Sequence, residues 1–309
     1  MRVIEGLQKI ERLKKPVLTI GNFDGIHIGH QKIIEQVKNM AEEIGGISVV
    51  MTFDPHPLHV LKPEKILGLI TPLPVKKRIF DKFGIDVLLV IKFENELREL
   101  NAEEFVRTIL LKKIGISGLV LGSDFRFGRD AEGDVNLIEN FSKKHGFSFI
   151  KIDPVALDGE KVGSNKIRKM IIDGDVKKAA QFLGRPFTIV GRVIYGAGIG
   201  KKIGYPTANL AFFENQLLPK NGVYVTEIEF RGQRFPSVTN VGLKPTFRYD
   251  RISIETHILN FHEDIYGMEL EVIFYERIRD EERFASVKEL IRAIEEDIRK
   301  AEILLNLKT

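Results

Sequence analysis

Ten residues near the start of the chain place glycines, a carboxylate and two histidines in one short segment. They read Gly21-Asn22-Phe23-Asp24-Gly25-Ile26-His27-Ile28-Gly29-His30. An apolar run (17–20) precedes them and the helical pattern of Ile33, Ile34 and Val37 follows, so we expect a strand, a glycine-rich turn and a helix start. Glycines let backbone approach a ligand, and a helix N-terminus favours an anion. Two imidazoles can donate hydrogen bonds to phosphate oxygens as negative charge develops. The segment therefore predicts a phosphate site, the alternative being a plain turn with two surface histidines.

A second glycine-rich segment spans residues 196–209, Gly-Ala-Gly-Ile-Gly-Lys-Lys-Ile-Gly-Tyr-Pro-Thr-Ala-Asn. It is not a Walker A loop, because Lys202 stands where Ser or Thr is required, and its glycine spacing does not fit a dinucleotide fingerprint. Glycines mixed with lysines, here Gly200, Lys201 and Lys202, can still wrap phosphates. Thr207 and Asn209 point the same way in an extended segment, and their oxygens suit a Mg²⁺ ion that keeps waters and phosphate ligands. A glycine-rich hairpin without a ligand is the alternative.

Glu255 is a candidate general base. In an extended segment it shares one face with Ser253 and His257, while Ile252, Ile254 and Ile258 take the other face. A carboxylate on a polar face near a cation site can accept a proton. The alternative is an ordinary solvated glutamate.

The first half of the chain alternates apolar strands with helical patterns. This predicts a parallel sheet covered on both faces, with ligands beyond the carboxyl ends of the strands. We expect strands at 17–20, 47–53, 87–91, 118–122 and 147–150, and helices ending near 44 and spanning about 75–83, 101–112 and 134–144.

Three further features of this half are candidate ligand contacts. The alternatives are, in order, a plain turn, which residues 52–57 alone would favour, an exposed loop with two aromatic residues, and a basic surface helix. The loop 52–57, Thr-Phe-Asp-Pro-His-Pro, breaks a strand sharply. The loop 122–128 carries an aromatic pair beside two charges, Asp124-Phe125-Arg126-Phe127, which suits stacking on a ring system. Ser164 is a predicted N-cap of a short helix that contains Arg168.

The pattern of predicted elements changes after Arg185-Pro186. Strand-like segments at 188–195, 223–230, 234–240, 252–259 and 270–276 follow one another without intervening helices, which predicts an antiparallel barrel. A capped helix begins at Ser286, and we expect its apolar stripe to pack on the barrel core. The stripe comprises Leu290, Ile291, Ile294, Ile298, Ala301 and Leu305. We therefore predict an α/β protein with domains at 1–183 and 184–309.

Composition narrows the class of protein. The 309 residues are 43% hydrophobic and 29% charged, which is typical of a globular protein. The chain has no cysteine, which excludes disulfides and thiolate metal sites and fits the cytoplasm. We see no signal core and no run long enough to cross a membrane, so we expect a cytoplasmic protein with no membrane partner. The net charge of +4 lies within 1–183 without a dense basic stripe, so we expect no nucleic-acid partner.

The N-terminal motifs resemble the HxGH signature of the nucleotidyltransferase superfamily, and with 52–57 and 122–128 they look like its flavin adenylyltransferase branch. The resemblance implies that His27 and His30 are catalytic and that Asp124, Phe125, Arg126 and Phe127 contact the flavin. It implies an ATP site formed by Gly21, Asn22, Phe23, Asp24, Gly25, Ser164 and Arg168. This chain departs from the family at Gly163 and Asn165, where hydroxyl residues are usual.

The C-terminal motifs resemble those of riboflavin kinases. The run 204–209 looks like their PTAN motif, and 222–224, 240–247, 255–259, 266–267 and 279–284 match in the expected order. The resemblance implies that Thr207 and Asn209 hold the Mg²⁺ that accompanies ATP and that Glu255 is the general base. It also implies that Arg279 contacts the flavin. The nucleotide would be contacted by Gly200, Lys201 and Lys202. Ile199 and Lys201 stand where many relatives carry Arg.

Together the motifs identify the chain as a member of the bifunctional riboflavin kinase and FMN adenylyltransferase family. This implies the small-molecule substrates riboflavin, FMN and ATP, with Mg²⁺ as cofactor and flavins as substrate and product rather than prosthetic group. Two alternatives stay open. One is a nucleotidyltransferase with another acceptor, such as pantetheine phosphate or glycerol phosphate, and the other is a flavin- or nucleotide-binding regulator without turnover. The sequence leaves the oligomeric state unknown.

Overall fold

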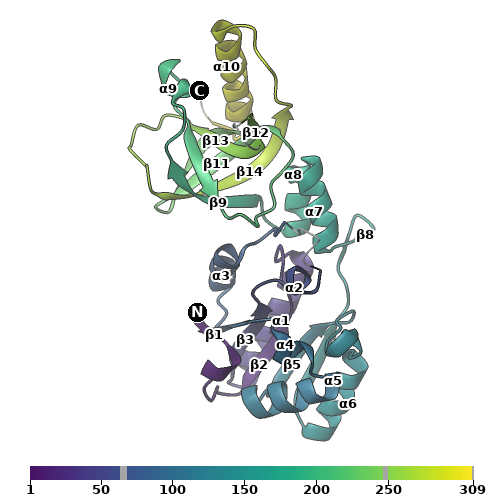
Figure 1. Ribbon diagram of the computed structural model, residues 1–309. Helices are drawn as coiled ribbons and strands as arrows, with labels where there is room; N and C mark the ends of the chain where they lie inside the picture. Colours follow the sequence, from purple (N-terminus) through teal and green to yellow (C-terminus); the bar gives the residue numbers. More distant parts are fainter. Residues whose placement is uncertain (63–67, 246–249, 308–309) are drawn as a thin grey trace. The chain divides into compact units, whose positions relative to one another are not determined.

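The computed structural model of the chain describes residues 1–62, 68–245 and 250–307 and divides into two compact units, Met1–Ser164 and Asn165–Thr309 (Figure 1). Thr246 and Phe247, part of the motif at 240–247, lie outside the described residues. Residues 165–183 group with the second unit, and the domain boundary after residue 183 stays a prediction.

The first unit is built on a six-stranded sheet in which every neighbouring pair of strands is parallel, as predicted. The strand order is β1-β4-β3-β2-β5-β6. The strands are β1 Arg2–Glu5, β2 Pro16–Ile20, β3 Ile47–Phe53, β4 Val87–Ile91, β5 Gly118–Gly122 and β6 Ser148–Ile152. Strand β1 was not predicted, because it is a short edge strand in which Ile4 alone is buried.

Helices cover both faces of this sheet (Figure 1). On one face, Ile34 of α1 and Phe80 of α3 pack with Val50 and Leu88, while on the other a larger cluster joins the segment around Phe105 to the sheet. The helices are α1 Ile28–Glu43, α2 Pro57–Leu61, α3 Leu73–Lys82, α4 Asn95–Arg98, α5 Ala102–Glu104, the π-helix η2 Phe105–Ile114 and α6 Val135–His145. Short 3₁₀ turns at Leu7–Lys9 and Arg129–Ala131 and a two-strand hairpin, β7 Ala156–Leu157 with β8 Glu160–Lys161, complete the unit.

The second unit contains a closed six-stranded barrel whose strand pairs are all antiparallel, again as predicted. Its order is β10-β13-β12-β11-β14-β9. The elements are α7 Ser164–Asp173, α8 Val176–Leu183, β9 Phe187–Ile194, α9 Ile199–Lys202, β10 Ala208–Phe212, β11 Gly222–Phe230, β12 Gln233–Pro245, β13 Asp250–Ile258, β14 Glu269–Arg279 and α10 Val287–Leu304. We did not predict β10 as a strand, yet it is the one that closes the barrel between β9 and β13. Across the described residues, no helix is both long enough and apolar enough to cross a bilayer.

Helix α10 uses its apolar stripe in two ways. Ser286 caps the helix, as predicted, and Ala301, Ile298 and Leu305 pack against the barrel core. Leu290 and Ile294, however, line a cavity instead of joining that core cluster. The expectation that the whole stripe serves core packing was therefore only partly correct.

The barrel interior holds a chain of buried hydroxyl groups. Thr226 Oγ1 lies 2.8 Å from Ser237 Oγ and 2.7 Å from Thr239 Oγ1, and Thr239 Oγ1 lies 2.9 Å from Thr256 Oγ1. All four residues are completely buried. A buried hydroxyl is tolerated only when it has a hydrogen-bond partner, so this chain fixes how β11, β12 and β13 face one another.

Replacing Thr226, the centre of this chain, should destabilise the barrel. Thr226→Val keeps the side-chain shape but removes two hydrogen bonds, and we expect it to lower the free energy of unfolding by about 1–3 kcal/mol. Thr256→Val removes only the terminal bond and should lower it less. All tyrosines lie in the second unit, so tyrosine fluorescence during urea unfolding reports on that unit alone. Equal losses in the two variants would contradict the hydrogen-bonded chain.

Candidate active sites

The two histidines of the first unit lie together at the N-terminus of α1. His27 is the N-cap, and its Nδ1 accepts a hydrogen bond from the backbone N–H of His30 at 3.3 Å. The two rings stack with centroids 3.7 Å apart. A Cβ at Gly29 would lie 3.2 Å from His27 Nδ1, so the glycine makes room for the ring to fold back over the helix start. The predicted order of strand, turn and helix is confirmed, with helix residues beginning at Ile28.

The loop before His27 is strained and tied down. Phe23 and Ile26 have φ values of 47° and 43°, which residues other than glycine rarely adopt. The buried Asp24 accepts a hydrogen bond from Thr71 N at 3.0 Å, and Gly25 N donates to Thr71 Oγ1 at 2.6 Å. Thr71 was not predicted as part of this loop, because a threonine before a proline matches no known motif.

Both histidines are neutral at pH 7. Burial is the main cause that lowers the pKa of His27 to about 4. Burial, followed by the charges of His27 and Lys76, places the pKa of His30 well below its usual value. Because His27 Nδ1 accepts a hydrogen bond, the proton of that ring is on Nε2. The His30 Nδ1 atom is buried and has no hydrogen-bond partner among the described residues, which marks a place for a ligand or water.

A lysine that we did not single out reaches the same loop. Lys76 on α3 is 5% exposed, and its Nζ donates to Asn22 O at 2.6 Å and contacts Thr52 Oγ1 at 3.3 Å. Burial lowers the pKa of Lys76 to about 8, while Asp24 and Asp54 act in the opposite direction. In sequence, Lys76-Lys77-Arg78 is indistinguishable from a solvated helix face.

The residues expected to contact flavin lie beyond the end of β5. Phe127 is buried in the core and stacks on Phe125 with centroids 5.8 Å apart. Asp124 forms an ion pair with Lys161 of β8 at 2.7 Å, and Arg126 forms one with Asp134 at 3.4 Å. Phe127 thus has core contacts of its own, and the flavin role of the four residues stays a prediction.

Ser164 is the first residue of α7 rather than its N-cap, so that prediction was wrong. Its hydroxyl donates to Asp24 O at 2.7 Å, which ties the end of the first unit to the glycine-rich loop. Arg168 is 8% exposed and donates to Asn165 Oδ1 at 2.7 Å. The nucleotide contacts predicted for Ser164 and Arg168 remain untested.

In the second unit a cavity of about 310 Å³ brings together residues that are far apart in the sequence. Gly200, Thr207, Glu255 and Arg279 of the predicted sites line it. Lys201 and Lys202 belong to the short helix α9 and are exposed, and neither lines the cavity. Residues not predicted as site residues also line it, including Asn240, His257, Glu281, Phe284 and Asp297.

Strand register places Glu255 beside two amides. Glu255 of β13 pairs directly with Asn209 of β10 and with Asn240 of β12, so the three side chains share one face of the barrel wall. The opposite face carries Ile254, Thr256 and Ile258, which are buried. The predicted polar face of β13 is therefore present. His257 Nδ1 lies 2.8 Å from Pro206 O, which fixes the turn just before Thr207.

Arg279 is anchored on the cavity wall by a buried carboxylate. Its Nε lies 3.0 Å from both carboxylate oxygens of Asp297, and its Nη2 lies 2.7 Å from Oδ2. The Arg279 guanidinium also stands over the ring of Phe284. Asp297 comes from α10, so this pair joins the last helix to the barrel.

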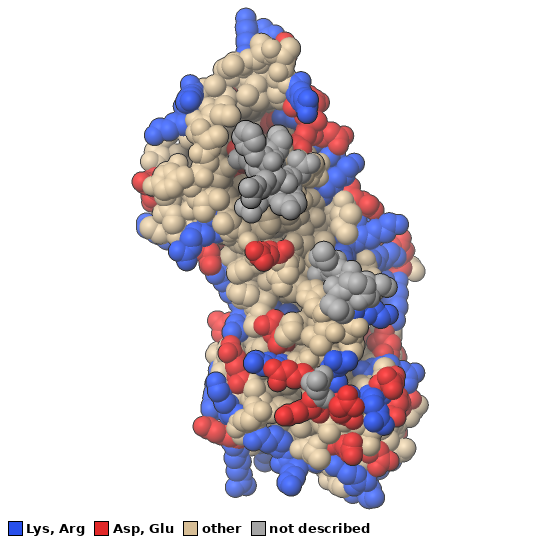
Figure 2. Space-filling view, viewed as in Figure 1, with Lys and Arg blue, Asp and Glu red and all other residues tan. Residues whose placement is uncertain are grey.

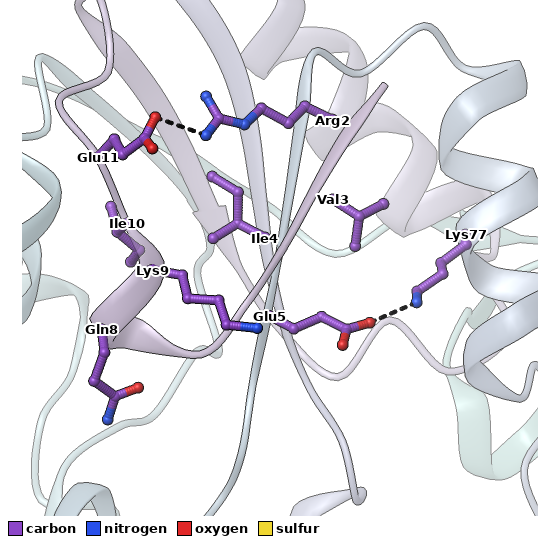
Figure 3. Close-up of a pocket in the computed structure, with 9 residues that line it drawn as sticks. All are labelled: Arg2, Val3, Ile4, Glu5, Gln8, Lys9, Ile10, Glu11 and Lys77. Atoms are coloured by element: carbon purple, nitrogen blue, oxygen red, sulfur yellow. Dashed lines mark hydrogen bonds and ion pairs between the residues drawn. The ribbon is translucent and has the colours of Figure 1, made fainter.

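A larger hollow of about 610 Å³ lies against β1 and contains none of the predicted site residues (Figure 3). Four of its charged side chains form two ion pairs, Arg2 with Glu11 at 2.8 Å and Lys77 with Glu5 at 2.9 Å. Acidic and basic side chains are also interspersed over the face drawn in Figure 2.

Comparison with known proteins matches each half of the chain to a protein family. Residues 9–166 match the family described as FAD synthetase, and residues 183–305 match the family described as riboflavin kinase. The bifunctional riboflavin kinase/FMN adenylyltransferase of Buchnera aphidicola from Acyrthosiphon pisum is 36% identical over 96% of each chain. The protein of the same description from Bacillus subtilis is 36% identical over 94% of this chain and 93% of its own. A crystal structure described as a macrolide-efflux protein from Streptococcus pneumoniae superposes with a TM-score of 0.90 at 31% identity, covering 98% of this chain and 99% of that one.

These matches define a transferase with an adenylyltransferase part followed by a kinase part. The chain belongs to the bifunctional riboflavin kinase/FMN adenylyltransferase family.

The neutral state of His27 predicts how acid affects the first unit. Unfolded His27 takes up a proton near pH 6.5, whereas in the folded unit it does so only near pH 4. The free energy of unfolding of the first unit should therefore fall as the pH drops from about 6.5 to about 4. At about 1.4 kcal/mol per pKa unit, His27 accounts for a loss of roughly 3 kcal/mol. His30, whose pKa is also lowered, adds to this loss. His27→Asn keeps an N-cap acceptor but cannot titrate, so it should lose less stability. Hydrogen exchange of the α1 amides at several pH values measures this, and parallel losses in both proteins would contradict it.

Proposed function

We propose that the second unit transfers the γ-phosphoryl group of ATP to riboflavin, giving FMN and ADP, and that the first unit transfers AMP from ATP to FMN, giving FAD and diphosphate. One observation carries this assignment: in each unit the motif residues from separate segments converge, at the α1 N-terminus in the first and at the cavity of the second. We also propose that the protein acts in the cytoplasm.

In the kinase site, Glu255 would accept the proton of the riboflavin ribityl hydroxyl as that oxygen attacks the γ-phosphorus. The bond from the γ-phosphorus to the β,γ-bridging oxygen breaks, and ADP leaves. Phosphoryl transfer needs mostly positioning and charge neutralisation from the protein. The amides of Asn209 and Asn240 beside Glu255 provide a polar wall on which the reacting groups can be aligned.

The side chains around Glu255 also fit a Mg²⁺ ion that arrives with ATP. Thr207 lines the cavity, and Asn209 pairs in register with Glu255, so hydroxyl and amide oxygens lie near one another. Among the described residues, no cluster of three or more His, Cys, Asp or Glu could hold a metal on its own. This agrees with an ion that takes several ligands from phosphate and water. When bound, Mg²⁺ would neutralise phosphate charge.

In the adenylyl site, a phosphate oxygen of FMN would attack the α-phosphorus of ATP, and diphosphate would leave. His27 and His30 would act as neutral hydrogen-bond donors to the extra negative charge, together with the N–H groups that begin α1. The residues 21–25 would lie against the nucleotide. Flavins are substrate and product in both steps, so no resident prosthetic group is required.

A time course with riboflavin, ATP and Mg²⁺, with the flavins separated by chromatography, tests the proposal. We expect FMN to appear first and FAD to follow. Riboflavin that stays unchanged would contradict the kinase assignment. FMN that is supplied directly and not converted would contradict the adenylyl assignment.

The Glu255 carboxylate should be needed for the kinase reaction alone. Glu255→Gln removes the proton acceptor, and we expect the rate of FMN formation to fall about 10²–10⁴-fold while FMN is still converted to FAD. The control is Glu276→Gln, which changes a half-buried barrel carboxylate that pairs with Lys177. Loss of both activities in Glu255→Gln would contradict two independent sites.

His30 should be needed for the adenylyl reaction alone. Because His30→Ala removes a donor at the reacting phosphate, riboflavin should still give FMN, and FMN should accumulate with an adenylyl rate reduced about 10²–10³-fold. His145→Ala, at an exposed position of α6, is the control and should make FAD normally. Unchanged FAD formation in His30→Ala would rule out the role given to His30.

A further inference from the structure

Lys76 is a buried charge that the proposed reaction does not yet use. Its ammonium group lies between the ends of two central strands, bonded to Asn22 O after β2 and to Thr52 Oγ1 within β3. No carboxylate of the described residues forms an ion pair with it. Its neighbour Lys77 differs, because it lies on another face of α3 and pairs with Glu5 at 2.9 Å.

A buried ammonium without a paired carboxylate is costly unless something compensates for it. Two oxygen acceptors satisfy two of its three N–H groups, and both are uncharged. Asp24 and Asp54 are the carboxylates that face Lys76, but Asp24 directs Oδ1 to Thr71 N. A site that retains such a cation is matched to an anionic ligand.

The surroundings of Lys76 point to a phosphate as that ligand. Its position at the carboxyl ends of β2 and β3 is where ligands bind in parallel sheets. The stacked pair of His27 and His30 lies near it, and desolvation lowers the pKa of both rings, so neither imidazole carries a full positive charge at pH 7. The N-terminus of α1 supplies only a partial charge. Within the first unit, a polyphosphate bound here therefore needs a full cation from a residue other than the two histidines.

We propose that Lys76 supplies a fixed positive charge to the adenylyl site from within the first unit. Two of its N–H groups hold Asn22 and Thr52, and the third donates to a phosphate oxygen of the bound nucleotide. This inference rests on the proposed adenylyl function of the first unit. Lys76 thereby both positions the loop that leads to His27 and contacts the substrate.

The test compares Lys76→Met and Lys76→Arg, with Lys77→Met as the matched control. For FAD formation from FMN, we expect kcat/KM to fall about 100-fold in Lys76→Met, as for loss of one donor to a developing anion. Lys76→Arg should recover most of that loss, and Lys77→Met should stay within about twofold of the unchanged protein. An increase in KM for ATP rather than for FMN would place the contact on the nucleotide, whereas an increase for FMN alone would overturn that assignment.

The pH profile separates charge from packing. The kcat/KM for FAD formation should fall as the pH rises through about 8, because the ammonium of free Lys76 then loses its proton. Lys76→Arg should lack this fall, since guanidinium stays charged. Hydrogen exchange of the α1 amides, which lie in the same unit as Lys76, shows whether each variant is folded there. A Lys76→Arg profile that still falls near pH 8 would overturn the inference even if Lys76→Met does not fold.

Binding of diphosphate, the product of the adenylyl step, decides the inference without turnover. Calorimetric titration should show binding to the unchanged chain that weakens at least tenfold in Lys76→Met. If the unchanged chain makes no FAD, the proposed function fails, yet this titration still tests Lys76. Equal diphosphate affinity, or equal kcat/KM, in Lys76→Met and the unchanged chain would overturn the role of Lys76.

Discussion

The adenylyl site depends on how the first turn of α1 is capped. An imidazole, rather than a hydroxyl or a carboxylate, accepts the N–H of His30. This bond fixes the orientation and tautomer of His27, and it stacks the two rings on one another. The capping interaction therefore determines which ring nitrogen of His27 carries the proton. Gly29 is part of the same constraint, because a larger residue would meet the ring.

In the barrel, strand register rather than helix capping fixes the positions of the polar side chains. Glu255, Asn209 and Asn240 lie side by side because three strands pair directly at those positions. The hydroxyl chain on the interior face of the same strands, from Ser237 to Thr256, has fixed partners throughout. A shift by one residue would exchange the two faces and bury Glu255. The buried hydroxyls thus support the position of the carboxylate on the opposite face.

Much of this arrangement could be predicted from the sequence. The parallel sheet, the barrel, the cap at Ser286 and the convergence of Thr207 with Glu255 follow from apolar runs and local motifs. The edge strand β1 and the closing strand β10 were missed, because each is short and depends on its neighbours for definition. Lys76, Thr71 and Asp297 were missed for a different reason. Their burial and partners arise from long-range packing, and no local pattern distinguishes a buried lysine or aspartate from a solvated one.

The pairing of Arg279 with Asp297 has a consequence for the order in which the two sites can form during synthesis. Every element that shapes the α1 N-terminus, including Thr71 and Lys76, precedes residue 165. The kinase cavity instead needs Leu290, Ile294 and Asp297 from α10. Since domains generally fold as units while the chain emerges from the ribosome, the first unit can be complete while the barrel still lacks one wall of its cavity. A ribosome-bound chain at that stage would hold a formed α1 N-terminus and an unfinished barrel cavity.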